Sequence, residues 1–278
     1  MGGRYSIIHH GVRGNDSIDV LKCNDCGLVW LSEFITDDQY YENSGMRSAD
    51  VEQTTKQIRV AAKKDDQRRY KFIRNLIENR VLLDFGCGVG GVLQYARDDA
   101  ETVYGVELEK KMCKTLEQEG IRCFQSLDLA EKELTGKVDV VTMFHVLEHL
   151  ADPVKMLKRL KMLLKPGGVM VIEIPNAEDA LLSLYKSKPF ADFTYWEDHL
   201  YLYNNFTFSS LMKMANLKIR FLGQIQRYSL SNTMYWLSKS KPGGHKVWTM
   251  LSDEKLDEEY GKKLSELGIA DTIIAIVE

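Results

Sequence analysis

From residue 81 onward, short apolar runs alternate with segments whose apolar residues recur at helical spacing. The runs "VLLDF", "TVYGVEL", "IRCFQSL", "VDVVTMF" and "VMVIEIP" are nearly continuous in apolar residues, which is typical of strands buried on both faces. Between them lie the helical patterns "GGVLQYARDDA", "EKKMCKTLEQEG" and "PVKMLKRLKMLLKPGG". This alternation indicates βαβ units, so we predict a doubly wound α/β fold around a mostly parallel sheet.

The pattern changes on both sides of this region. Residues 1 to 45 show no clear periodicity and are predicted to be irregular, whereas residues 54–79 carry apolar positions at helical spacing. Near the C-terminus, the helical segment "FTFSSLMKMANLK" precedes two strand candidates, "IRFLGQIQ" and the final "DTIIAIVE". The stretch between these two candidates is too long for a hairpin turn, so we predict an inserted cap.

The predicted organisation has four parts: an N-terminal segment over 1–54, a core over 55–225, a cap over 226–268 and a last strand over 269–278. The net charge of -3 and the pI of 6.1 give no bulk reason to bind nucleic acid. No signal peptide or membrane-length apolar segment is evident, and the five cysteines form no secreted framework. We therefore expect a cytoplasmic protein with reduced thiols.

The segment "VLLDFGCGVGG" carries the strongest chemical signal. A strand ends at Asp84, and a turn containing Gly86 and Gly88 leads into a helix, so a ligand can approach the backbone closely. The spacing also satisfies the dinucleotide-binding pattern G-x-G-x-x-G, with Glu107 at the end of the next strand. However, a carboxylate at position 84 would repel a pyrophosphate, whereas it suits the ammonium and sulfonium groups of S-adenosylmethionine.

Three further motifs, "VYGVELEKKM", "VDVVTMFHVLEHLADP" and "LLKPGGVMVIEIPN", follow this turn. In order and spacing, the four motifs resemble those of class I S-adenosylmethionine-dependent methyltransferases, over residues 55–222. The resemblance implies a Rossmann-like sheet of seven strands, mostly parallel, with the last strand antiparallel. It also implies that the cofactor is S-adenosylmethionine and that the reaction is methyl transfer.

The resemblance assigns roles around the glycine turn. Asp84, Gly86, Cys87 and Gly88 would contact the methionine part of the cofactor. Glu107 would hold the two ribose hydroxyl groups, since it ends the next strand.

The same resemblance assigns the adenine and methyl ends of the cofactor. Leu108 would lie against the adenine, and the position facing the adenine amine falls either on Ser126 and Leu127 or on Asp128. Phe144 and His145, just past the fourth strand, would lie beneath the transferable methyl group. Tyr41, beside a second tyrosine, would close over the cofactor.

The stretch "HVLEH", residues 145–149, matches the His-x-x-Glu-His pattern of zinc metalloproteases. Asp152 followed by Pro153 is typical of a helix start, so residues 145–149 connect a strand to that helix and hold at most one helical turn. A zinc pair of this pattern needs a continuous helix, which argues against a zinc hydrolase.

Some related quinone-pathway O-methyltransferases carry acids and a histidine at this connection, which leaves a magnesium role open. Here the first of those positions is His145, which weakens the analogy. We favour a bracing role for Glu148 and His149 and assign no metal to them.

Methyl transfer to a hydroxyl group requires a positioned acceptor and removal of its proton. We predict His199, in "YWEDHLYLYNN", as the base, with His145 as the alternative. The acceptor pocket is expected between the N-terminal segment, residues 176–205 and the cap. Aromatic and amide side chains that suit a sugar occur there, namely Tyr195, Tyr228, Asn232 and Tyr235.

The N-terminal segment contains one Cys-x-x-Cys pair, Cys23 and Cys26. Families that this chain resembles, including methyltransferases acting on sugars, often have an N-terminal zinc module built from two such pairs. Upstream, this chain offers only His9 and His10 as further ligands. We therefore favour a metal-free turn over a zinc site at these cysteines.

The first-choice acceptor is a sugar or a phosphorylated precursor of a surface glycan, which would place the protein in polysaccharide biosynthesis. A quinone or another small aromatic molecule is the alternative, and a non-catalytic S-adenosylmethionine-binding protein is a third hypothesis. Cations at the end of the cap would suit an anionic small molecule. The cap could instead be a solvated surface or the contact of a homodimer.

Overall fold

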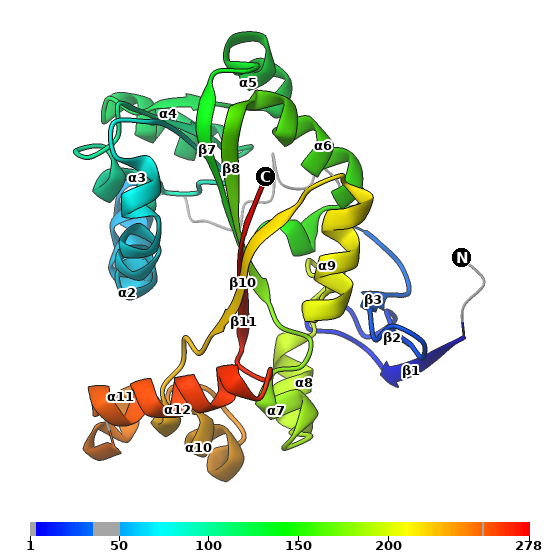
Figure 1. Cartoon of the computed structure of the whole chain (residues 1–278). Helices are drawn as coiled ribbons and strands as arrows, with labels where there is room; N and C mark the ends of the chain where they lie inside the picture. The colour runs from blue at the N-terminus through cyan, green and yellow to red at the C-terminus, as the bar shows by residue number, and fades with distance from the viewer. Residues whose placement is uncertain (1–3, 36–50, 252) are drawn as a thin grey trace.

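A seven-stranded sheet forms the centre of the molecule in the computed structural model, which describes residues 4–35, 51–251 and 253–278 (Figure 1). The strand order is β10-β11-β8-β7-β4-β5-β6. The strands are β4 (Val81–Phe85), β5 (Thr102–Val106), β6 (Arg122–Phe124), β7 (Val138–Phe144), β8 (Leu164–Pro175), β10 (Ile219–Ile225) and β11 (Thr272–Val277). Strands β4 to β8 are parallel, and β11 runs antiparallel to both β8 and β10, which confirms the predicted sheet.

Helices cover both faces of this sheet, as a doubly wound fold requires. One face packs against α2 (Val51–Ile77), α3 (Gly91–Ala96) and α4 (Lys110–Gln118). The other face packs against α5 (Leu127–Leu134), α6 (Pro153–Leu163) and α9 (Asn205–Met214). Successive strand residues point to opposite faces, so Leu82 belongs to the first layer and Leu83 to the second.

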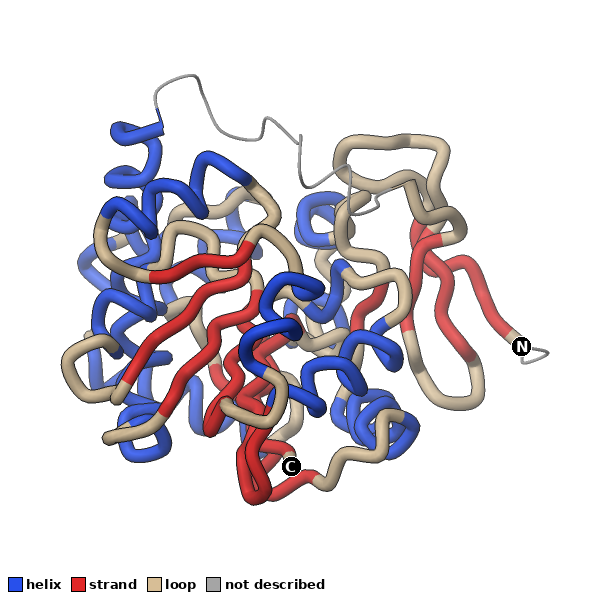
Figure 2. Tube along the Cα trace, turned by 90° about the horizontal axis from the view of Figure 1, so that it is seen from above, coloured by secondary structure: helices blue, strands red, loops and turns tan. Residues whose placement is uncertain are grey.

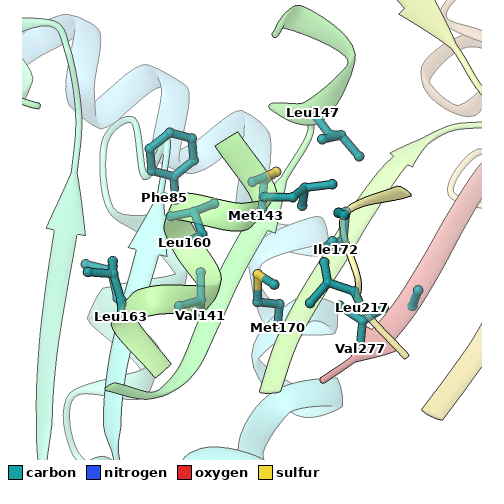
Figure 3. Close-up of a cluster of buried hydrophobic side chains, with 14 of the residues drawn as sticks. Phe85, Val141, Met143, Leu147, Leu160, Leu163, Met170, Ile172, Leu217 and Val277 are labelled. Carbon is teal, nitrogen blue, oxygen red and sulfur yellow. The ribbon is translucent and has the colours of Figure 1, made fainter. Parts of the chain in front are cut away.

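The larger apolar cluster lies on the α5, α6 and α9 side of the sheet. Figure 3 shows Met143 of β7, Ile172 of β8 and Leu160 of α6 within it. All three side chains are excluded from solvent, with exposures of 0–1%. Burial of this kind contributes about 1.5–3 kcal/mol for each large side chain, so this layer fixes the strand ends that carry the candidate site.

The N-terminal segment is not irregular, and that prediction is wrong. The strands β1 (Tyr5–His9), β2 (Val20–Cys23), β3 (Val29–Leu31) and β9 (Tyr201–Leu202) form a four-stranded antiparallel sheet beside the main one (Figures 1 and 2). These strands are short, and β3 pairs with β9 from much later in the chain. Local periodicity could not reveal such a pairing, because its apolar partners, such as Leu200, are distant in sequence.

The predicted cap consists of α10 (Leu230–Lys239), α11 (Gly244–Val247), η2 (Thr249–Leu251) and α12 (Glu254–Glu266). It lies beside α7 (Ala180–Ser183) and α8 (Lys188–Thr194) at one end of the sheet (Figure 1). The rings of Phe190 and Trp236 join the two groups at 5.3 Å. Within the described ranges, no helix combines the length and apolarity needed to cross a membrane.

Two local predictions can be compared with the structure. Asp152 caps α6 by accepting a hydrogen bond from the backbone N–H of Lys155, with Pro153 at the first turn, as predicted. The helix was expected to reach residue 168, but it ends at Leu163, because Pro166 cannot continue a helical hydrogen-bond ladder. Strand β8 therefore begins earlier than predicted.

Candidate active site

The glycine turn follows β4 at the carboxyl edge of the sheet. Asp84 is 4% exposed, and its Oδ1 accepts a hydrogen bond from the Thr142 hydroxyl of the neighbouring β7 at 2.7 Å. Gly86 has φ of 74°, and a Cβ added there would lie 2.4 Å from the Val146 side chain. Only glycine fits this position, so the turn brings a bare backbone to the end of β4.

Glu107 lies across from this turn at the end of β5. Its carboxylate accepts hydrogen bonds from the backbone N–H groups of Gly88 at 2.8 Å and Glu109 at 2.9 Å. Cys87, between the two glycines, is buried, and its Sγ is 2.6 Å from where a Cβ on Gly105 would lie. The residues predicted for the methionine and ribose ends of the cofactor therefore lie at adjacent strand ends.

The adenine end is defined by the start of α5. Ser126 caps this helix, and Leu127, its first residue, is buried. Asp128 is 75% exposed and forms an ion pair with Arg159 of α6. Asp128 therefore already has a charged partner, and both alternatives for the adenine amine stay predictions. Leu108 is half-buried after β5, whereas Tyr41 lies outside the described residues.

Helix α2 covers the site, which the sequence did not predict. Asp66 lies against the turn, because a Cβ added to Gly91 would meet its Oδ2 at 2.0 Å. The Arg69 guanidinium lies 5.0 Å from the ring centre of Phe144, the residue expected beneath the methyl group. Burial raises the pKa of Asp84 to about 7, against the opposing effects of the Thr142 hydrogen bond and the Arg69 charge.

A buried carboxylate organises the α2 side of the sheet edge. Glu173 of β8 has 0% exposure and accepts hydrogen bonds from Arg68 at 2.8 and 3.0 Å and from Arg69 at 2.8 and 3.0 Å. His145 Nε2 lies 3.3 Å from the same carboxylate. Burial would raise the pKa of Glu173, but these partners hold it well below the ordinary range, so the carboxylate is ionised.

His145 is held on both ring nitrogens. Its Nδ1 lies 3.2 Å from Glu148 Oε1, and its Nε2 lies 2.9 Å from Nη1 of Arg227, at the start of the cap. Because a guanidinium only donates, a neutral His145 accepts there with Nε2 and donates from Nδ1 to Glu148. Arg227 also binds Asp65 of α2 at 2.6 Å, so the cap, α2 and the histidine are joined.

A second group lies on the other side of Glu148. Glu148, His149 and His199 each offer a ligand atom, and these atoms all lie within 4.8 Å of one another. The Nδ1 of His149 is 2.7 Å from the backbone oxygen of Asp198, which braces the connection as predicted. Glu148 Oε2 and His199 Nδ1 are buried without a hydrogen-bond partner among the described residues. Orphaned buried polar atoms of this kind fit a cation, and two imidazoles with one carboxylate suit zinc or manganese better than magnesium.

His199 is less suited to proton removal than its position in the sequence suggested. Burial lowers its pKa to about 3, although the charge of Glu148 acts in the opposite direction. Its ring packs against those of His149 at 5.0 Å and Trp196 at 5.4 Å. At neutral pH His199 is therefore a neutral imidazole and a weak base.

The predicted acceptor contacts are dispersed. Asn232 accepts hydrogen bonds from the N–H groups of Gly243 and Gly244, and Tyr235 packs edge-on against Trp248, so both serve the interior of the cap. Tyr228 is 48% exposed.

Tyr195 and the cysteine pair belong to the region around the N-terminal sheet. Tyr195 lines a cavity between that sheet and α7–α8. Cys23 pairs with Tyr5 in the β1–β2 ladder, whereas His9 pairs with Val20 at the other end. The structure therefore keeps His9 away from Cys23 and Cys26 and offers these thiols no third ligand among the described residues.

The whole arrangement defines the class of protein. Residues 54–221 match the family described as "Methyltransferase domain" (Methyltransf_23), which is more than half of the chain. The chain belongs to this family and is an S-adenosylmethionine-dependent methyltransferase of class I, with S-adenosylmethionine as the cofactor.

Curated relatives have more specific names. The chain is 32% identical over 118 residues to a "Ubiquinone biosynthesis O-methyltransferase" of Caulobacter vibrioides, covering 39% of this chain and 46% of the relative. A protein of the same name from Chromobacterium violaceum is 34% identical over 100 residues, covering 33% of this chain and 43% of the relative. The chain thus spans about half the length of the curated relatives it matches.

Solved structures agree on the fold. A methyltransferase from Archaeoglobus fulgidus superposes with a TM-score of 0.52 at 18% identity, covering 77% of this chain and 93% of that one. A putative methyltransferase from Bacillus halodurans gives 0.51 at 16% identity, covering 77% and 98%. At this identity the likeness is one of architecture alone.

Replacing Glu107 by Ala is expected to weaken binding of S-adenosylhomocysteine by about 1–3 kcal/mol, because charge-assisted hydrogen bonds to the ribose are lost. Isothermal titration calorimetry measures this change. Glu109→Ala is the control, since Glu109 donates to the carboxylate from its backbone N–H, which the substitution keeps. Unchanged affinity in Glu107→Ala would refute the ribose assignment.

Binding of S-adenosylhomocysteine is expected to tighten as pH rises through about 7, the pKa to which burial raises Asp84. The ammonium group of the ligand prefers the ionised carboxylate, so at lower pH binding must first remove a proton, at a cost of up to about tenfold per pH unit. Titrations between pH 6 and pH 8 measure the slope. Asp84→Asn should flatten it, and an equal slope in that variant would contradict the assignment.

Metal-free protein is expected to bind one Zn²⁺ or Mn²⁺ through Glu148, His149 and His199, which thermal unfolding would detect as an increase in Tm on adding the ion. His199→Ala should abolish this increase, whereas His10→Ala should retain it. An increase that survives His199→Ala would exclude this ligand set.

Proposed function

We propose that this methyltransferase methylates a hydroxyl group on a small aromatic acceptor, such as a quinone precursor. The observation that carries the proposal is His145 at the end of β7, held by Glu148 on one nitrogen and adjoining Phe144. The names of the curated relatives support an aromatic acceptor. They give no support to a sugar acceptor or a role in polysaccharide biosynthesis, our first expectation.

The protein's part in the reaction follows from this geometry. When bound, S-adenosylmethionine supplies an activated methyl group, so the chain mainly positions the acceptor and removes its proton. Glu148 accepts the Nδ1–H of His145 and leaves Nε2 as the proton acceptor. The acceptor hydroxyl would take the place that Nη1 of Arg227 has on Nε2 and would pass its proton to that nitrogen, while the bound cofactor would supply the methyl group and keep its sulfur as a neutral thioether.

Three partly buried arginines, Arg68, Arg69 and Arg227, lie near the proposed base. They form ion pairs with Glu173, Asp65 and Asp66. A carboxylate or phenolate on the acceptor would accept hydrogen bonds from these guanidinium groups next to the base. A small anionic molecule is consistent with the partner predicted from the sequence.

An acceptor panel with methyl-labelled S-adenosylmethionine tests the proposal. We expect transfer to catechol and faster transfer to protocatechuate, which adds a carboxylate. Transfer to nucleotide sugars or sugar phosphates instead of the catechols would refute the aromatic assignment while leaving the methyltransferase class intact.

A further inference from the structure

A cavity lies away from the active site described above. It has a volume of about 730 Å³ and lies between the N-terminal sheet and the segment that carries α7 and α8. Neither the glycine turn after β4 nor the site histidines His145, His149 and His199 line it. Its volume is that of a typical small-molecule site.

The lining of this cavity contains three lysines and one acidic residue, Glu178. Lys22, Lys186 and Lys188 all contribute to it. Lys22 lies 3.4 Å from Glu178, and Lys188 lies 2.8 Å from Asp192, but both pairs are open to solvent. Lys186 has no acidic partner among the described residues. One ammonium group is therefore available to an incoming anion.

His9 adds a polar group that is not charged. Its side chain is 12% exposed, and its Nε2 lies 3.1 Å from Asp192. Burial lowers the pKa of His9, with Asp192 acting in the opposite direction, so the imidazole is neutral at physiological pH. The positive charge of the cavity thus comes from the lysines.

Apolar, well-packed side chains also line the cavity. Tyr195 is 7% exposed, Val29 3% and Ala177 9%, and Leu182 packs against the same cluster. The Tyr195 ring also contacts His9 at 5.2 Å between ring centres. Apolar side chains and an unpaired cation in the lining of one cavity suit a ligand that has both an anionic group and a flat apolar body.

We propose that this cavity binds a small organic anion, with its phosphate or carboxylate at Lys186 and its apolar body against Tyr195 and Leu182. The site is separate from the cofactor and does not depend on which acceptor is methylated. The two ligand parts are recognised together, so neither inorganic phosphate nor an uncharged aromatic molecule satisfies the site alone.

Calorimetry with 1-naphthyl phosphate tests the proposal on the full chain. We expect it to bind at least about tenfold more tightly than inorganic phosphate or 1-naphthol, because each lacks one of the two contacts. Saturation with S-adenosylhomocysteine should leave its affinity unchanged. Displacement by S-adenosylhomocysteine, or no advantage over the two partial probes, would overturn the proposal.

Two variants locate the binding. Lys186→Asn removes the ammonium at a position whose φ is 50°, which asparagine tolerates, and should weaken binding about tenfold. Leu182→Trp should fill the cavity and abolish binding. Lys213→Asn, on α9 and outside this cavity, is the matched control. Unaltered binding in both cavity variants, with thermal unfolding showing them folded, would refute the site.

Discussion

Replacing Glu173 by Gln is expected to lower the free energy of unfolding by about 3 kcal/mol. The substitution removes the carboxylate in β8 that binds both Arg68 and Arg69. Two guanidinium groups would then be buried without that charge, which costs more than the lost hydrogen bonds alone. We place the effect at the lower end for a buried ion pair, because the arginine side chains retain 26% and 12% exposure.

Urea unfolding measures this change, with Glu278→Gln as the control. Glu278 forms ion pairs with Lys218 and Arg220 at the surface, so its replacement should cost under about 1 kcal/mol. The pKa of Glu173 lies below its ordinary value of 4.5. The wild-type advantage should therefore be complete at neutral pH and decrease as pH falls below about 4.5. Equal losses in the two variants would show that Glu173 stabilises no more than a surface pair.

The sequence predicted the main sheet because its strands are local apolar runs. Strands such as β7 and β8 are buried on both faces, and their continuous apolar residues identify them without knowledge of their partners. The N-terminal sheet lacked such a signal. Strand β1 exposes Tyr5 and Ile7, and β3 becomes recognisable only when β9 lies beside it.

The candidate site likewise contains residues that the sequence predicted and residues that it did not. The turn at Gly86 and the carboxylate of Glu107 lie in motifs of fixed spacing, so sequence alone placed them together. The position of Arg227 depends on how the cap folds back on α2, which no local pattern encodes. A weaker signal was present for Glu173, since one acid in the apolar run "VMVIEIP" needs a buried partner, and α2 offers adjacent arginines.

The type of a residue alone does not establish its role as a catalytic base, as His199 shows. An imidazole after the fifth parallel strand is well placed for a base, but burial lowers its pKa to about 3. Burial cannot be read from "YWEDHLYLYNN", because part of the packing around His199 comes from His149, in the connection after β7. The same burial that weakens His199 as a base makes it a better ligand for a cation.

Replacing His145 by Asn is expected to reduce kcat by about 10²–10⁴-fold, while the affinity for S-adenosylhomocysteine changes little. The variant removes the nitrogen that accepts the hydroxyl proton but keeps a residue that tolerates the backbone φ of 56° at this position. The measurement is single-turnover transfer to protocatechuate under cofactor saturation, so that binding and chemistry are separated. His10→Asn makes the same substitution at an exposed histidine of the N-terminal segment and should leave kcat unchanged.

A comparison with His199→Asn then distinguishes the two histidines. If His145 is the base, an acceptor that is already ionised should restore much of the lost rate in His145→Asn, because no proton needs to be removed. A phenol of low pKa, such as a nitrocatechol, provides that test at neutral pH. His199→Asn should show no such selective rescue, since His199 is a neutral, partly buried imidazole grouped with Glu148 and His149. Selective rescue of His199→Asn, with an unchanged kcat in His145→Asn, would reverse the assignment and make His199 the base.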